Sequence, residues 1–186
     1  MKLTTSFRVV LPATVAATVA ATVAATGAAA LVSAAALPAG AAAMPKFAKP
    51  KVFGTSFQAD PRHDFTRHIS PRHDGILRGW VTYYRSGTAE YEPIKWVKDT
   101  SGHTEGYFTG PAEGDAMAYA SPLAKNVVFY SATGCKGTTV TVENDSLGSK
   151  RCSRSVLVSR MKDGHRPALI TVYRGRIVKV QEIYTP

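Results

Sequence analysis

The chain contains only two cysteines, Cys135 and Cys152, and it has no Cys-x-x-Cys pair. It also lacks a Gly-x-Ser-x-Gly sequence and a Gly-Lys-Ser or Gly-Lys-Thr sequence. These absences exclude a dithiol redox motif, the nucleophile turn of many serine hydrolases and a phosphate-binding loop. Any function must therefore come from a fold or a site that these short motifs do not describe.

Acidic residues are also scarce, since 13 Asp and Glu face 23 Lys and Arg, which gives a formal net charge of +10. Lys2 and Arg8 are the only charged residues before position 44, so residues 44–186 keep 21 basic against 13 acidic residues, a balance of +8. This surplus favours contact with anionic wall polymers, nucleic acid or acidic proteins. The alternative is that scattered charge serves only solubility.

The first 43 residues have the composition of an export signal. Lys2 and Arg8 precede an uncharged stretch, residues 9–37, that consists mainly of Ala, Val and Thr, and small residues end the segment at Ala43. This pattern predicts a signal peptide over residues 1–43. The stretch is long enough to span a bilayer, but Ala and Thr gain little from hydrocarbon, so we expect a secreted mature protein without a stable membrane span.

The cysteine pair agrees with export. In an oxidising compartment two isolated cysteines are most simply a disulfide, and Cys135 and Cys152 would enclose the 16 residues between them. The alternative is a catalytic thiol, but two such cysteines would tend to oxidise each other outside the cell.

Residues 44–74 are predicted to form a basic, turn-rich arm, because Pro, Lys and Gly are mixed there with isolated Phe residues. From residue 75 onward, short runs of β-branched and aromatic residues alternate with Gly, Pro and Ser. No window shows a sustained i, i+3, i+4, i+7 stripe of apolar residues, which argues against a helical domain. We therefore expect residues 75–186 to form a single all-β domain, an antiparallel sandwich or barrel with one disulfide.

Two hairpins are predicted within this domain. Residues 76–84 and 91–99 flank one turn, and residues 168–173 and 176–184 are joined by Arg174 and Gly175, where glycine can adopt the positive φ of a tight turn. Further strands are expected at residues 106–110, 126–132, 138–144 and 155–161, and at 116–122, which would equally suit a helical turn.

The segment 127–158 resembles a βγ-crystallin Greek key. A Phe-Tyr pair, a glycine after the turn and a Ser before a β-branched residue mark that motif, and the matching positions here are Phe129, Tyr130, Gly137, Leu147, Ser155 and Val156. Cys135 stands where the family has an aromatic residue. The resemblance implies an exported microbial crystallin-like domain, a group that includes calcium binders and inhibitors of secreted proteases.

The same resemblance implies that Asn144 and Asp145 are oxygen ligands for calcium, because the family places Asn or Asp twice in its calcium signature. The alternative is a plain Asn-Asp turn between strands. No other cofactor is expected.

The tetrapeptide Pro-Arg-His-Asp occurs twice, at residues 61–64 and 71–74, after Asp60 and Ser70. Asp or Ser before Pro is typical of a type I turn, so we interpret the copies as two solvated turns. His63, His68 and His73 are of the type that zinc prefers, but their five-residue spacing does not point them toward one place.

The arginines of this arm suggest a second use. Together with Arg78, the residues Arg62, Arg67 and Arg72 slightly outnumber the three local aspartates, which makes the arm a candidate docking segment for a polyanion.

A small secreted hydrolase, most plausibly a ribonuclease, is the competing hypothesis. Such enzymes use a Glu, a His and Arg residues on a β-sheet, and the polar loop 98–115 supplies His103 and Glu105, with Arg85 as a candidate phosphate ligand. Nothing in the spacing selects these residues over others of the same type. The leading hypothesis is a secreted, non-catalytic β module that binds an extracellular protein or an anionic envelope component, for example as an inhibitor of an extracellular enzyme.

Overall fold

The computed structural model describes residues 44–115 and 117–185. The predicted signal peptide, residues 1–43, lies outside the described residues. Within the described part of the chain, no helix is long and apolar enough to cross a bilayer.

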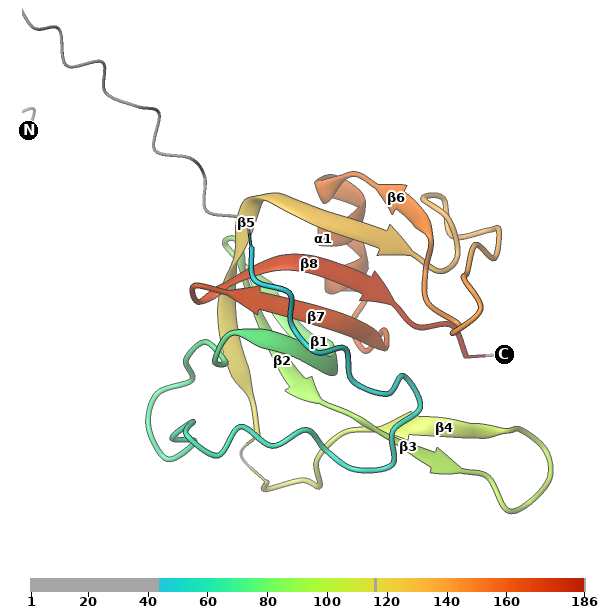
Figure 1. Cartoon of the computed structure of the whole chain (residues 1–186), viewed down its shortest axis with the longest axis horizontal. Helices are drawn as coiled ribbons and strands as arrows, with labels where there is room; N and C mark the ends of the chain where they lie inside the picture. The colour runs from blue at the N-terminus through green and yellow to red at the C-terminus, as the bar shows by residue number, and fades with distance from the viewer. Residues whose placement is uncertain (1–43, 116, 186) are drawn as a thin grey trace, which may run out of the picture. The chain divides into compact units, whose positions relative to one another are not determined.

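The domain is all-β and its centre is a closed barrel of five strands (Figure 1). The strands are β1 (Gly75–Arg85), β2 (Thr88–Pro93), β5 (Tyr119–Ser131), β7 (Ala168–Tyr173) and β8 (Arg176–Glu182). They follow the order β2-β1-β7-β8-β5, and pairing of β2 with β5 closes the barrel. Of the two predicted architectures, the molecule therefore adopts the barrel.

Three short strands and one helix are added to the barrel. The elements β3 (Lys95–Lys98) and β4 (Gly106–Thr109) pair as a separate hairpin, and β6 (Lys150–Cys152) extends the main sheet as its edge. Helix α1 (Arg154–Lys162) follows β6 directly. The sequence pattern located β1, β7 and β8. The single strand predicted at 91–99 is instead the end of β2 and the whole of β3, which leaves the barrel after Pro93 (Figure 1).

The predicted tight turn at Arg174 and Gly175 has the expected geometry, and the first hairpin has a similar turn, shorter than the predicted segment 85–90. Ser86 and Gly87 join β1 to β2 with φ of 50° and 86°, and Arg174 and Gly175 join β7 to β8 with φ of 51° and 70°. Positive φ at both central residues matches the right-handed twist of the flanking strands, and this is why glycine occupies the second position. One pairing is not antiparallel, because β5 and β8 run parallel.

The prediction of a strand at residues 155–161 is wrong, because this segment lies in α1. Ser153 caps the helix, since its Oγ accepts a hydrogen bond from the backbone N–H of Val156 at 3.4 Å. Basic residues in the last turn oppose the negative end of the helix dipole. The helix is short and buries only Leu157, Arg160 and Met161, so its sequence has no apolar stripe from which a helix could be predicted.

The prediction of a strand at residues 138–144 is also wrong. Apart from one isolated bridge between Val142 and Gly148, this segment forms an irregular loop after β5. The loop folds back on itself, because Thr139 and Thr141 donate backbone hydrogen bonds to Thr133 and Ala132. The β-branched residues of this segment predicted a strand, but in the fold the segment has no neighbouring strand to pair with.

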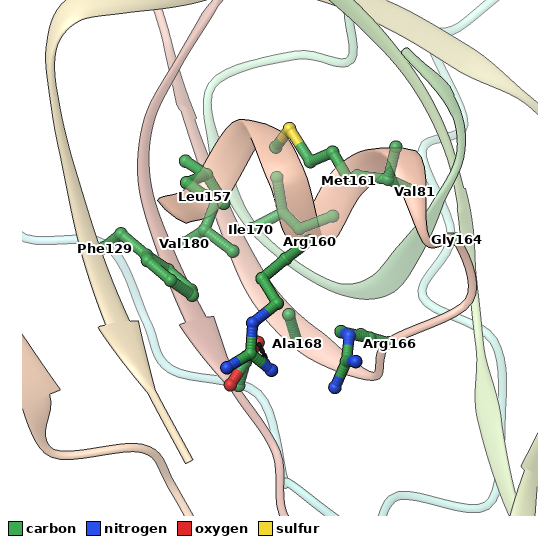
Figure 2. A pocket seen from close by; sticks show the side chains of 11 residues that line it. Val81, Phe129, Leu157, Arg160, Met161, Gly164, Arg166, Ala168, Ile170 and Val180 are labelled. Atoms are coloured by element: carbon green, nitrogen blue, oxygen red, sulfur yellow. Dashed lines mark ion pairs between the residues drawn. The ribbon is translucent and has the colours of Figure 1, made fainter. Parts of the chain in front are cut away.

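The main core fills the barrel, and α1 covers one opening. Leu77, Tyr91, Tyr119 and Phe129 are among its fully buried side chains. Figure 2 shows Leu157 and Met161 of α1 beside Ile170 and Val180 of the barrel, where a cavity of only about 20 Å³ remains. A space of that size holds no more than one water molecule, so the barrel interior is a packed core and not a ligand pocket.

A second, smaller core lies outside the barrel. The segment from residue 44 to residue 58 crosses the outer face of β1, β7 and β8 without forming a strand (Figure 1). Its residue Val52 packs with Leu147, Leu169 and Ile183. The first part of the predicted arm is therefore attached to the barrel by an apolar cluster.

The arm is also held by a buried arginine. Arg78 of β1 is 2% exposed, and its guanidinium donates to the carbonyls of Lys51 at 2.6 Å, Ser56 at 2.6 Å and Ile94 at 2.9 Å. Burial lowers the pKa of Arg78 from its usual value. At Gly54 a Cβ atom would lie 2.3 Å from this guanidinium, so only glycine lets the arm approach it. The arm thus supplies carbonyl partners for a charge that the barrel alone leaves unsatisfied.

The predicted disulfide between Cys135 and Cys152 is present, and their Cα atoms are 5.5 Å apart. It joins the irregular loop after β5 to the end of β6, and hence to the start of α1. The bond therefore constrains a part of the chain that has few strand hydrogen bonds of its own.

Replacing Arg78 with Met should release the arm. The variant keeps the apolar stem but leaves three carbonyls without their donor, and we expect the free energy of unfolding to fall by roughly 3 kcal/mol. Urea unfolding measures this loss, and limited proteolysis should cut near residues 51–58 first. The exposed Arg85→Met variant is the control and should change stability by less than about 0.5 kcal/mol. Equal stability of both variants would contradict the anchoring role.

Removing the disulfide with Cys135→Ala and Cys152→Ala together should lower the free energy of unfolding by about 3 kcal/mol, because the crosslink spans a separation of 17 residues. Urea unfolding of the double variant, compared with the oxidised wild-type protein in the absence of reductant, checks this value. If the double variant unfolds at the wild-type urea concentration, the loop does not depend on the crosslink.

Candidate functional site

The two Pro-Arg-His-Asp copies adopt different conformations. The first forms the predicted turn, with the backbone N–H of His63 donating to the carbonyl of Asp60 at 2.9 Å. The second copy forms no turn at Pro71 to His73, so the prediction of a turn there is wrong. The chain is held against the barrel at this point, because the carbonyl of Ser70 accepts from Ala120 at 3.0 Å and the N–H of Arg72 donates to Tyr91 Oη at 3.3 Å.

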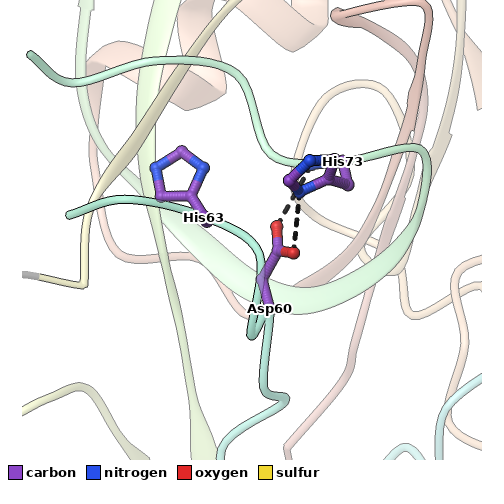
Figure 3. A group of neighbouring side chains, drawn as sticks. All are labelled: Asp60, His63 and His73. Carbon is purple, nitrogen blue, oxygen red and sulfur yellow. Dashed lines mark hydrogen bonds and ion pairs between the residues drawn. The ribbon is translucent and has the colours of Figure 1, made fainter.

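This difference brings Asp60, His63 and His73 together (Figure 3). His73 Nδ1 lies 2.8 Å from one oxygen of Asp60, and the backbone N–H of His73 donates to the other oxygen at 3.1 Å. One ligand-type atom from each of the three residues lies within 4.8 Å of the others. The expectation that these histidines diverge is therefore wrong for His63 and His73, whereas His68 is exposed and is not part of the group.

Aromatic rings form the inner wall of this group. The ring of His63 lies 4.5 Å from that of Phe65 and 4.7 Å from that of Tyr119, and Tyr119 stacks on Tyr91 at 5.5 Å. Tyr91 Oη is hydrogen-bonded to Ser121 Oγ at 2.8 Å, but Tyr119 Oη is buried without a hydrogen-bond partner among the described residues. Burial, helped by the nearby Asp60 carboxylate, raises the pKa of Tyr119 to about 12. The phenol therefore keeps its proton at neutral pH and can donate a hydrogen bond.

The arginines predicted to dock a polyanion do not present one free cationic surface. Arg67 pairs with Asp64 at 3.0 Å, and the guanidinium of the half-buried Arg72 donates to the carbonyl of His73 at 3.0 Å. Only Arg62 is exposed without a recorded partner among the described residues. The arm therefore uses two of its three arginines for internal contacts.

The residues proposed for a hydrolase are not assembled into one site. His103 and Glu105 are exposed in the turn between β3 and β4, whereas Arg85 lies at the turn between β1 and β2. The strands β2 and β3 follow each other between these turns (Figure 1). At about 3.3 Å per residue, strands of this length extend for roughly 30 Å. A side chain cannot span that length.

The loop that carries His103 is organised by Asp99. Its carboxylate accepts hydrogen bonds from the backbone and side chains of Ser101 and Thr104, and these bonds lower the pKa of Asp99 to about 2. The carboxylate therefore closes the turn between β3 and β4.

The calcium candidates Asn144 and Asp145 lie in an exposed turn. The carboxylate of Asp145 pairs with Lys49 Nζ of the arm at 2.7 Å. A cation from the protein itself is therefore already beside the carboxylate that would bind calcium.

A cationic surface occurs instead around β6, and we call it the basic edge. It consists of the exposed residues Lys136, Lys150, Arg151 and Arg154. None of the four forms an ion pair within the described part of the chain. The segments that carry them, residues 131–142 and 148–162, contain no Asp or Glu, and the disulfide joins these two segments. The fold thus gathers positive charge that looks scattered along the chain.

A groove runs along the basic edge. Lys136 and Lys150 share this groove with four threonines, which are Thr133, Thr138, Thr139 and Thr141. The hydroxyl of Thr141 already donates to the carbonyl of Ser131 at 3.0 Å, so the two ammonium groups are the main donors that the groove offers to anionic oxygens.

Buried charges hold the start of this loop in place. Arg160 donates to Thr133 Oγ1 at 3.1 Å and to the carbonyl of Gly134 at 2.9 Å. Glu182 accepts from Ser131 Oγ at 2.7 Å and from the N–H of Ala132 at 2.8 Å, and it lies 3.7 Å from Arg160. The groove is therefore attached to the barrel through α1 and β8.

Sequence reasoning missed both groups for different reasons. The only sequence signal for the basic edge is the absence of acidic residues around both cysteines of the disulfide. A search for motifs by residue spacing does not detect such an absence. The Asp60, His63 and His73 group has no local signal, because it depends on the way residues 64–72 return the chain to Asp60.

No family model matches the chain, and no similar curated protein or solved structure was found. The resemblance of residues 127–158 to a βγ-crystallin Greek key stays a prediction. In the structure, Phe129 and Tyr130 lie near the end of β5, Gly137 has a φ of 81°, and Ser155 and Val156 lie in α1.

Proposed function

We propose that the protein is an exported, non-catalytic β-barrel module that binds an anionic extracellular partner through the basic edge. The observation that carries this proposal is a groove in which Lys136 and Lys150 lie beside threonine side chains, with the exposed Arg151 and Arg154 following Lys150 in the chain and no acidic residue in either segment. The predicted leader and the disulfide support an extracellular location.

The charge arrangement favours a partner with repeated anionic groups. Lys150 and Arg151 are consecutive residues of an edge strand, so their side chains leave opposite faces of the sheet, and Lys136 and Arg154 flank them through the disulfide. Four cations spread in this way match several charges of a chain better than one compact ligand. A phosphate-bearing wall polymer fits this arrangement, and an acidic surface of an extracellular protein would use the same contacts.

A binding role accounts for more of the molecule than the hydrolase hypothesis does. The barrel interior has space for a single water, and His103 and Glu105 lie far from Arg85. The basic edge, in contrast, combines exposure, unpaired charge and a rigid attachment. These properties suit stoichiometric binding.

Charge reversal tests this proposal. The variant Lys150→Glu with Arg151→Glu should bind a phosphate-bearing wall polymer, and single-stranded RNA as a second polyanion, at least tenfold more weakly than the wild type. A plot of the logarithm of the association constant against the logarithm of the salt concentration should also become less steep by about 1.5, because two ionic contacts are lost. Fluorescence anisotropy across a series of NaCl concentrations measures both effects.

The matched control is Lys46→Glu with Lys98→Glu, which changes the net charge equally at exposed positions outside the basic edge. It should retain most of the affinity. If both double variants lose affinity equally, the partner senses only net charge. If neither double variant loses affinity and the Lys150→Glu, Arg151→Glu variant aggregates, the two charges serve only to keep the edge strand β6 from pairing with other chains. Degradation of the RNA by the wild type would contradict a non-catalytic role.

A further inference from the structure

The strongest feature that the proposed function leaves unused is the group formed by Asp60, His63 and His73. These residues supply two imidazoles and one carboxylate, the ligand set of several zinc sites that keep an open coordination position. All three come from the arm, far from the basic edge in the sequence. We propose that they bind one divalent ion of the zinc type.

The ligand atoms are close to the spacing that such an ion requires. Zinc lies about 2.0–2.2 Å from nitrogen and oxygen ligands, so neighbouring atoms of a tetrahedral site are about 3.3 Å apart. The three atoms here lie within 4.8 Å of one another, and Asp60 and His73 are already 2.8 Å apart. Small rotations of the His63 and His73 rings therefore complete the geometry.

The framework around the ligands limits their freedom. The side chain of Asp60 is only 6% exposed and accepts the backbone N–H of His73, and its own carbonyl accepts the backbone N–H of His63. The rings of Phe65 and Tyr119 contact the His63 ring, so it can turn through small angles only. A metal ion would thus bind at little cost in side-chain entropy.

The open side of the group faces solvent. The side chain of His73 is 47% exposed, so an ion can enter from that side and keep a water as its fourth ligand. With one carboxylate and two neutral imidazoles, the occupied site carries one positive charge. The guanidinium of Arg72, which donates to the carbonyl of His73, adds a cation nearby. This positive charge opposes the binding of a cation that is held by electrostatics alone.

Tyr119 provides an independent sign of an incomplete site. Its hydroxyl is buried beside the Arg72 guanidinium but forms no hydrogen bond of normal geometry among the described residues, and its ring contacts His63. Buried hydroxyls rarely stay unpaired, and donors next to metal ligands commonly bond to a coordinated carboxylate or water. Oxygen-preferring Ca²⁺ and Mg²⁺ are poor candidates, since two of the three ligands are nitrogens.

The test uses the untagged mature protein with its disulfide intact, because an affinity tag of histidines would bind the same ions. Calorimetry should find one Zn²⁺ per chain with a Kd in the micromolar range or below, and Co²⁺ should give the visible absorption of a tetrahedral or five-coordinate ion. Calcium at millimolar concentration should not compete. Zinc at 100 times its Kd should raise the melting temperature by roughly 5–10 °C.

Three substitutions locate the site. His63→Gln and His73→Gln should each weaken zinc binding by at least tenfold, whereas His68→Gln, an exposed histidine midway between them, should leave it unchanged. Should either ligand variant fail to fold, imidazole nitrogen resonances of the wild type give the answer, since zinc should shift those of His63 and His73 but not that of His68. Absence of saturable binding of one Zn²⁺ per chain, or equal weakening by His68→Gln, would overturn the proposal.

Discussion

The architecture depends on one long strand, β5. Its first residues pair with β2 and close the barrel, and its last residues pair with β6 and β8. A strand of 13 residues is long for a domain of this size, and irregular register between Leu123 and Val128 lets it bend from one set of partners to the other. Without that bend the sheet would stay open, and Tyr119 and Phe129 could not both be buried.

The same strand separates the two surfaces that carry chemistry. The histidine group rests on its first residues, where Ala120 donates to the arm and the Tyr119 ring contacts His63. The basic edge lies at its other end, where Tyr130 is opposite Arg151. The two surfaces share no residue, so a metal ion at one end and a polyanion at the other do not compete for the same groups.

Local sequence rules predicted those parts of the fold that local forces decide. The Arg-Gly turn needs positive φ and formed where the rule placed it, whereas the first hairpin turns earlier than predicted, at Ser86 and Gly87. Helix α1 was missed, because capping by Ser153 and burial of a few side chains against the barrel outweigh a β-branched composition. The approach of His73 to Asp60 was missed as well, since two identical tetrapeptides took different conformations under different tertiary contacts.

The carbonyls that solvate Arg78 have a consequence for where the folding unit begins. They come from residues 51 and 56, upstream of the first strand, so a chain trimmed to start at Gly75 would place a guanidinium against an apolar layer with only Ile94 to receive it. In an exported chain, residues 51–56 leave the membrane before β1 and cannot bind Arg78 until β1 has followed. The last barrel contacts are therefore expected to form only after both have emerged, and any natural processing site has to lie ahead of Lys51.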